Sequence, residues 1–268
     1  MRILCTLVAA VSLAYGFDAQ EKETVRQTFP AAAHLEVDNV FGPIRVIGYS
    51  GTEIQMTAEK TIDADSQDRL EAAKREVKLE TTQSAGEVRI SVEGPFRDHG
   101  RWHSGYRVNY DFELKVPSAT AVRLATVNHG QIHLENTSGD FDLSNVNGEI
   151  ELVEAGGSGN AHTVNGKISA LFARNPAANT SFKTVNGSIE ASFRPNLSAD
   201  VRVKTFNGGA YTDFDATALP HAQPVADQRD GRFVYHADKT TALRIGAGGP
   251  EIKFETLNGT IRILKRGQ

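Results

Sequence analysis

Cysteine, aromatic residues and basic clusters are all scarce in this sequence of 268 residues. The one cysteine is Cys5, so the chain can form neither a disulfide framework nor a cysteine-ligated zinc site. Aromatic residues make up 7% beside 24 glycines, which favours tight turns and thin side-chain layers over a large enzyme core. The formal net charge is −4, and lysine and arginine form no basic stripe. Nucleic acid is therefore excluded as the main partner.

The N-terminus has the pattern of a signal peptide. Met1-Arg2 precedes the mostly apolar stretch 3–14, and Ala14 and Gly16 are small residues at the positions that signal peptidase favours. We predict that residues 1–16 are removed and that the mature chain is exported to the periplasm, the cell envelope or the medium. A buried N-terminal strand is the alternative. No later segment approaches the roughly 18 apolar residues of a membrane helix, so none is expected in the mature chain.

A short motif, Val-Asn-Gly-x-Ile, recurs in the second half of the chain. It stands at 146–150, 164–168 and 185–189, with looser copies at 127–132, 206–210 and 257–261. One repeat is therefore about 18 to 21 residues long, a period typical of stacked repeat proteins. Leucine-rich repeats would need a Leu-x-x-Leu-x-Leu frame, which is absent.

Apolar residues flank the motif with a period of two, as in Ile150-Glu151-Leu152 and Ile261-Arg262-Ile263. Each repeat should contribute short strands. We expect the residue before Asn and the Ile after the turn to point inward, forming continuous stripes in coils stacked about 4.8 Å apart. The outward column is a mixed polar face of His133, Glu151, Ser169, Glu190 and Arg262.

The Asn-Gly pairs predict a sharp corner in every coil, with glycine at positive φ and with asparagine side chains hydrogen-bonded along the stack. A row of ligands for sugar or calcium is the alternative, although turn chemistry already explains these residues. A threonine column runs beside them, at Thr126, Thr163, Thr184, Thr205 and Thr256. The predicted turn ladder consists of Asn128, Asn147, Gly148, Asn165, Gly166, Asn186, Gly187, Asn207, Gly208, Asn258 and Gly259.

The segment from about Tyr110 to Arg266 resembles a known family. Phe112-Glu113-Leu114-Lys115-Val116-Pro117 leads into serial Thr-Val-Asn-Gly-x-Ile units, and Gly246-Ala247-Gly248-Gly249 precedes the last unit. These features are similar to the bacterial "putative adhesin" domain of unknown function, a relative of the head-GIN β-solenoids. The resemblance implies an all-β, right-handed β-helix or β-solenoid of the envelope, and it implies no catalytic residues.

The N-terminal part fits the same plan less regularly. Residues 35–46 resemble one coil, with Phe41 where Asn usually stands, and we expect this to be the first rung. Alternating segments at 53–59, 77–81, 88–92 and 108–116 predict strands, and a short surface helix is predicted near 66–75, capped by Asp65 or Ser66. Residues 216–232 predict a loop. No linker separates the parts, so we expect one domain over 17–268, with irregular strands at 17–117 and repeat coils at 118–268.

Residues for chemistry are few. Asp98, His99, Trp102 and His103 form the densest polar and aromatic cluster, a candidate ligand site for a metal or a sugar, although a hairpin loop with a packed tryptophan is the favoured explanation. His129 and His133 are four residues apart. On strands this spacing spans a corner rather than one face of a helix, so a metal site formed by these two histidines is disfavoured. Hydrolase, zinc-protease and phosphate-loop motifs are absent, so we assign no catalytic, cofactor-binding or metal residue and expect no cofactor.

Two function classes remain. The first is a non-enzymatic envelope protein, adhesin-like or structural, that presents an extended solenoid surface to glycan or protein partners. The second is a carbohydrate-active β-helix enzyme, a polysaccharide lyase or hydrolase, which would need acids or bases converging from neighbouring coils. The missing convergence favours the first class.

Overall fold

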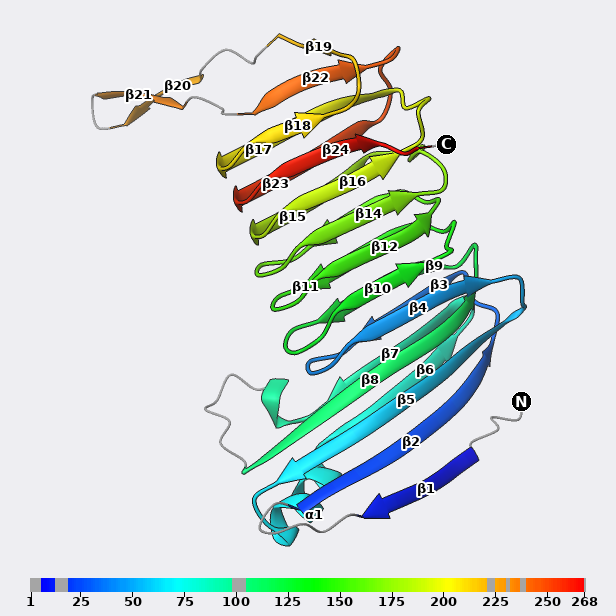
Figure 1. Ribbon diagram of the computed structural model, residues 1–268. Helices are drawn as coiled ribbons and strands as arrows, with labels where there is room; N and C mark the ends of the chain where they lie inside the picture. The colour runs from blue at the N-terminus through cyan, green and yellow to red at the C-terminus, as the bar shows by residue number, and fades with distance from the viewer. Residues whose placement is uncertain are drawn as a thin grey trace.

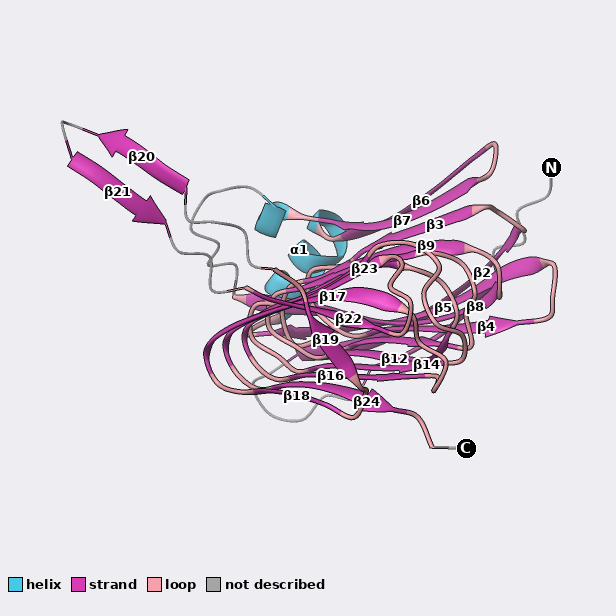
Figure 2. Ribbon diagram, turned by 90° about the horizontal axis from the view of Figure 1, so that it is seen from above, coloured by secondary structure: helices cyan, strands magenta, loops and turns pink. Residues whose placement is uncertain are grey.

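The protein, seen in a computed structural model, is built from two large β-sheets, and the strands of each sheet follow one another along one axis (Figure 1). The structure describes residues 6–12, 19–97, 105–220, 225–229, 232–236 and 240–267. Each sheet has eleven strands, and the hairpin β20 (Val225–Arg229) and β21 (Arg232–His236) forms a third, two-stranded sheet. The hairpin lies apart from the stack in both Figure 1 and Figure 2. The prediction of a mostly β chain with repeated strands is confirmed.

The order of strands in the two sheets shows how the chain is wound. Sheet 1 runs β1 (Thr6–Ser12), β2 (Ala19–Pro30), β5 (Glu53–Ala64), β8 (Tyr106–Pro117), β4 (Ile44–Tyr49), β10 (Ile132–Glu135), β12 (Ile150–Ala155), β14 (Ile168–Phe172), β16 (Ile189–Phe193), β24 (Ile261–Lys265), β18 (Ala210–Thr212). Sheet 2 runs β6 (Lys78–Ser84), β7 (Glu87–Glu93), β3 (His34–Asp38), β9 (Ala121–Thr126), β11 (Phe141–Asn145), β13 (Gly159–His162), β15 (Thr180–Asn186), β23 (Glu251–Asn258), β17 (Ala199–Asn207), β22 (Thr241–Ile245), β19 (Ala216–Ala218).

The repeating unit is a rung, which we define as one strand of sheet 2 and the strand of sheet 1 that follows it in the chain. Rungs stack by parallel pairing in both sheets, so that Ile132, Ile150, Ile168 and Ile189 are in register on neighbouring strands. Viewed from above, the strands of successive rungs overlie one another (Figure 2). The rungs stack in the order β7/β8, β3/β4, β9/β10, β11/β12, β13/β14, β15/β16, β23/β24 and β17/β18.

Rung order departs from chain order at both ends of the stack. The last rung of the chain, β23/β24, lies between β15/β16 and β17/β18, because β22 runs antiparallel to β17 and returns the chain to the inner slot. At the other end β7/β8 stacks outside β3/β4. The prediction that residues 35–46 form the first rung is therefore wrong in space, although Phe41 does stand opposite Asn128 as expected.

Long antiparallel strands close the N-terminal end. β5 pairs with β2 on one side and β8 on the other, and helix α1 (Gln67–Glu76) packs on these strands through buried Leu70 and Ala73. The Ser66 hydroxyl caps the helix by accepting from the Arg69 amide at 3.3 Å, as the sequence predicts. A 3-10 turn, η1 (Pro95–Arg97), follows β7.

Two predictions about local structure have different outcomes. Within the predicted signal peptide, Thr6–Ser12 forms the edge strand β1 against β2, and the remaining residues of 1–16 lie outside the described residues. The cleavage site stays a prediction. The segment 216–232, predicted as a loop, carries the short strand β19 and strand β20, because β19 pairs with β22 at the end of sheet 2 and β20 pairs with β21.

The core is a set of continuous apolar columns between the sheets. The isoleucine that follows each corner is fully buried in the column Ile44, Ile132, Ile150, Ile168, Ile189 and Ile261. Four phenylalanines interlock further along: Phe172 stacks on Phe193 with centroids 5.0 Å apart, and Phe182 stacks on Phe254 at 5.3 Å. Such offset and edge contacts stabilise the core beyond the area they bury.

The residue before Asn does not point inward as predicted. Strand β15 buries Thr180, Phe182 and Thr184, so its alternation turns Val185 outward. The threonine column therefore takes the inward place, and its hydroxyls donate to glycine carbonyls of the neighbouring rung, as Thr184 does to Gly166 at 3.0 Å. The valine column is half-exposed and ends at two exposed side chains, Leu257 at 46% and Phe206 at 62%.

The corner glycines are needed for a reason other than the predicted positive φ. Among the glycines of the turn ladder only Gly208, with φ of 156°, has that conformation. At the other corners the backbones of neighbouring rungs approach closely. A Cβ on Gly148 would lie 1.9 Å from the Gly130 carbonyl oxygen, and one on Gly187 would lie 2.0 Å from that of Gly166. No side chain fits at such a distance, so close approach explains the motif.

Candidate functional site

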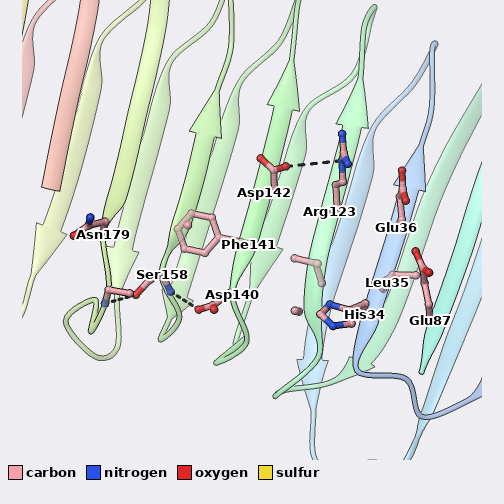
Figure 3. Close-up of a pocket in the computed structure, with 14 residues that line it drawn as sticks. His34, Leu35, Glu36, Glu87, Arg123, Asp140, Phe141, Asp142, Ser158 and Asn179 are labelled. Atoms are coloured by element: carbon pink, nitrogen blue, oxygen red, sulfur yellow. Dashed lines mark hydrogen bonds and ion pairs between the residues drawn. The ribbon is translucent and has the colours of Figure 1, made fainter. Parts of the chain in front are cut away.

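The candidate site is a groove of about 480 Å³ on sheet 2 (Figure 3). It crosses the starts of β7, β3, β9, β11, β13 and β15, so it runs along the stack rather than along a strand. Six strands at a spacing of about 4.8 Å make it roughly 24 Å long. An extended ligand would therefore contact several rungs at once.

Small residues create the hollow. Ala121, Gly159 and Ala178 lie along it, and the register sets Ala121 beside His34 and Gly159 beside Phe141, which carry longer side chains. Leu35, Val122 and Phe141 also border it, but strand alternation buries their side chains in the core. Apart from β7, each of these strands begins just after the second corner of a rung, which is where the chain passes from sheet 1 back to sheet 2. The lining residues therefore lie together near that corner.

The rim of the groove is polar and mostly acidic. Its carboxylates are those of Glu36, Glu87, Asp140 and Asp142, and Arg123 provides the one guanidinium group of the lining. Arg123 Nε lies 3.8 Å from Asp142 Oδ2. Arg89, on the neighbouring strand, donates to Glu36 Oε2 through Nε at 2.9 Å and a second nitrogen at 2.6 Å. The acidic rim opposes binding of polyanions.

Backbone groups hold the far end of the groove in place. The Ser158 amide donates to Asp140 Oδ1 at 3.0 Å, and the Ser158 hydroxyl accepts from the amides of Ala177 and Ala178 at 3.1 and 3.0 Å. Figure 3 shows His34, Glu36 and Glu87 at one end and Ser158 and Asn179 at the other. Polar groups are spread along the groove rather than aimed at one point, which suits recognition of an elongated ligand.

The asparagines of the turn motif form a second polar row, at the opposite corner of each rung. Each side-chain amide donates to the side-chain oxygen of the next asparagine, as Asn165 does to Asn147 at 2.8 Å and Asn186 to Asn165 at 2.8 Å. The chain of bonds follows spatial rung order, so Asn207 donates to Asn258 and Asn258 donates to Asn186. The row runs unbroken from Asn128 through Asn147, Asn165, Asn186 and Asn258 to Asn207.

The other residues singled out in the sequence are not brought together. Asp98, His99, Trp102 and His103 lie outside the described residues. His133 binds Glu151 through Nδ1 at 2.8 Å and Glu135 through Nε2 at 3.0 Å, so both of its nitrogens are engaged on the outer face of sheet 1. His129 is exposed at the corner with φ of 56°.

In the part of the chain that the structure describes, no three His, Cys, Asp or Glu side chains are grouped to hold a metal ion. Within the same residues, no helix has the length and apolar character needed to cross a membrane.

The groove is not among the sites predicted from the sequence. One signal was available, because Gly139 and Gly157 repeat at the second corner as Gly148 and Gly166 do at the first. A Cβ on Gly157 would lie 2.0 Å from the Gly139 carbonyl oxygen, so close approach operates at this corner too. The hollow itself depends on which side chains neighbour the small residues, which follows from the register of the strands.

No protein-family model matches the chain, and no curated protein matches its sequence. Solved structures do match it. A "putative cell adhesion protein" from Clostridium sporogenes is 8% identical, with 90% of this chain and 99% of that chain covered and a TM-score of 0.45. A "putative adhesin" from Bacteroides fragilis is 10% identical, with 91% and 97% covered and a TM-score of 0.38. The chain thus resembles bacterial proteins described as adhesins over about nine-tenths of its length.

Proposed function

We propose that this chain is an exported, non-enzymatic protein of the cell envelope, adhesin-like or structural, which binds an extended glycan or protein segment along its stacked rungs. The observation that carries the proposal is the groove on sheet 2, which crosses six strands and has a polar rim. A groove of that form can hydrogen-bond an elongated ligand at several points along its length.

In this proposal the chain is one right-handed β-solenoid domain over 17–268, with coils of about 18 to 21 residues, and such a fold suits the role. Parallel pairing repeats the same outward position from rung to rung. One such row on sheet 2 consists of Ser144, His162, Lys183, Glu255 and Lys204. Such repetition gives an elongated surface, the kind that solenoid proteins use for binding.

Charge narrows the class of partner. Four carboxylates line the groove, and a guanidinium group lies beside two of them, Arg89 at Glu36 and Arg123 at Asp142, so a neutral or amine-bearing polymer fits better than a polyanion. Among envelope partners we therefore favour an uncharged or amino-sugar glycan over a phosphate-rich one.

The test is retention of the purified chain on immobilised neutral, amino-sugar and acidic polysaccharides, with new reducing ends or unsaturated products measured in parallel. We expect retention on the first two and no products. Ala178→Trp should block the groove and abolish retention, because Ala178 is exposed within it. Ser169→Trp, on the outer face of sheet 1, is the matched control and should be retained normally.

Two results would contradict the proposal. Retention unaffected by Ala178→Trp would move binding away from the groove. Turnover that disappears with a single substitution, such as Glu151→Gln or His99→Ala, would establish the carbohydrate-active enzyme instead, because such a loss removes a transition-state group rather than a binding area.

A further inference from the structure

A buried lysine lies in the core of the N-terminal cap, which we define as strands β2, β5 and β8 with helix α1. The inward positions of β5 are Ile54, Met56, Ala58, Lys60, Ile62 and Ala64, so one charged residue interrupts an apolar row. Lys60 is 6% exposed. Burying an ammonium group is costly unless polar partners replace water, so the position requires an explanation.

Lys60 forms the centre of a row across three strands. Register places Glu23 of β2 on one side of it and Tyr110 of β8 on the other. The ammonium nitrogen donates to the Val77 carbonyl at the end of α1, at 3.2 Å, and lies 5.7 Å from the centre of the Tyr110 ring. Within the described residues the Val77 carbonyl is its one hydrogen-bond partner. An ammonium group has three hydrogens to donate, so two remain for another acceptor.

A cavity of about 320 Å³ adjoins this row. Its apolar wall includes Val25, Val77 and Leu79, and its polar lining includes the side chains of Glu23, Lys74 and Lys78. Lys74 is held by Glu21 at 2.6 Å and by Glu71 at 3.1 Å, so its charge is already paired. The cavity is thus apolar along one side and offers the unsatisfied Lys60 donors within the sheet.

We propose that this cavity binds a small organic anion whose carboxylate accepts from Lys60 and whose apolar body lies against Val25, Val77 and Leu79. A bound carboxylate would supply the charge-assisted hydrogen bonds that the ammonium group lacks. The volume limits the ligand to a small molecule, and the site is independent of the groove on sheet 2.

Charged neighbours act on the ammonium group of Lys60 in both directions. Burial lowers the pKa of Lys60, while Glu23 and Glu21 on β2 oppose that shift and Lys74 on α1 adds to it. Burial also raises the pKa of Tyr110, so its hydroxyl stays protonated near neutral pH and can donate. A carboxylate ligand would favour the charged lysine, which desolvation disfavours.

The experiment uses the purified chain and hexanoate as the probe, with 1-hexanol and hexylamine as the neutral and cationic analogues of equal chain length. The side-chain signals of Lys60, assigned in spectra by comparison with Lys60→Arg, are followed during each titration. We expect saturable shifts with hexanoate and affinity at least about tenfold weaker for both analogues.

Two substitutions complete the test. Lys60→Met should lower hexanoate affinity at least about tenfold. Lys22→Met, on the exposed side of β2 where Lys22 pairs with Glu59 at 3.2 Å, should leave it unchanged. Equal affinity for hexanol and hexanoate, or unchanged Lys60 signals in the unsubstituted chain, would overturn the proposal whatever the stability of Lys60→Met, and would leave Lys60 as a cap for α1.

Discussion

Each residue of the Thr-x-Asn-Gly motif satisfies a different requirement of the corner. The inward threonine hydroxyl donates to a glycine carbonyl of the neighbouring rung, as Thr256 does to Gly187 at 3.0 Å. The asparagine amide bonds to the next asparagine, and the glycine lets two backbones meet. Rungs without threonine keep the same bond by other means, because buried Asn145 donates to the Gly130 carbonyl at 2.9 Å. The motif therefore satisfies backbone carbonyls that would otherwise be buried without partners.

Replacing a corner glycine should destabilise the protein more than replacing its neighbour. Gly148→Val would place a side chain within 1.9 Å of the Gly130 carbonyl, and we expect a loss of about 3 kcal/mol or more in the free energy of unfolding. Glu149→Val is the control, because Glu149 is exposed. Urea unfolding of both variants is the measurement, and equal losses would show that the rungs do not approach closely at this corner.

The asparagine ladder gives a graded prediction. Asn165 makes two ladder bonds, one as donor to Asn147 and one as acceptor from Asn186, whereas Asn207 at the end of the row makes one. At about 1 kcal/mol for each bond, Asn165→Ala should lower the free energy of unfolding about twice as much as Asn207→Ala. Chemical denaturation of the two variants tests this. A larger loss for Asn207→Ala would contradict a cooperative row.

At the scale of elements, an ion pair ties the C-terminal end to the middle of the stack. Arg266, just after β24, donates to both carboxylate oxygens of Glu154 at 2.8 and 2.5 Å and to the Phe172 carbonyl at 3.2 Å. Glu154 lies at the irregularity where β12 shifts register against β14, with φ of 54°. Paired hydrogen bonds of this geometry orient both groups.

The pair should make stability depend on pH. The hydrogen bonds from Arg266 lower the pKa of Glu154 from its ordinary value of 4.5. The contribution is therefore present above pH 4.5 and is lost as pH falls through the lowered folded-state pKa. Arg266→Gln should reduce the melting temperature at pH 7, and the difference from the unsubstituted chain should shrink below pH 4.5.

The control for this effect is Arg262→Gln, since Arg262 lies 3.9 Å from Glu190 on an exposed face and makes a weaker contact. Thermal melts at several pH values compare the two variants. A difference between Arg266→Gln and the unsubstituted chain that stays constant down to pH 3 would show that the pair contributes packing rather than charge.

At the scale of the whole molecule, one core runs through the cap and all rungs. Buried apolar residues form a single cluster from Phe29 to Ile263. The insertion of β23/β24 between two other rungs also joins the end of the chain to segments more than 50 residues earlier, as in the bond from Asn207 to Asn258. Neither half therefore has a separate core.

We expect the chain to unfold in one transition, because the cap and the rungs share this core. Circular dichroism of the folded chain should show a β-rich spectrum. The thermal transition that it reports should coincide with the loss of hydrogen-exchange protection in both β5 and β14. Reducing agent should leave the transition unchanged. Two well-separated transitions, one for residues 17–117 and one for 118–268, would contradict a single folding unit.

Much of this fold could be predicted from local patterns in the sequence. The period of two, the 18 to 21-residue repeat and the Ser66 cap each depend on neighbours in the sequence, so the strands, the rung unit and helix α1 follow from residues alone. The column of asparagines is also set locally, because parallel pairing in register aligns any residue that recurs at the same place in each rung.

Tertiary structure decided what depends on which segments meet. The motif at 257–261 fits any rung position, and the antiparallel return through β22 selects the inner slot. The corner glycines are required by the short distance between neighbouring rungs rather than by their own φ. Strand alternation buries Thr184 and therefore turns Val185 outward. The groove on sheet 2 and the Lys60 cavity depend on which side chains from strands distant in sequence become neighbours, and a sequence pattern fixes no such neighbours.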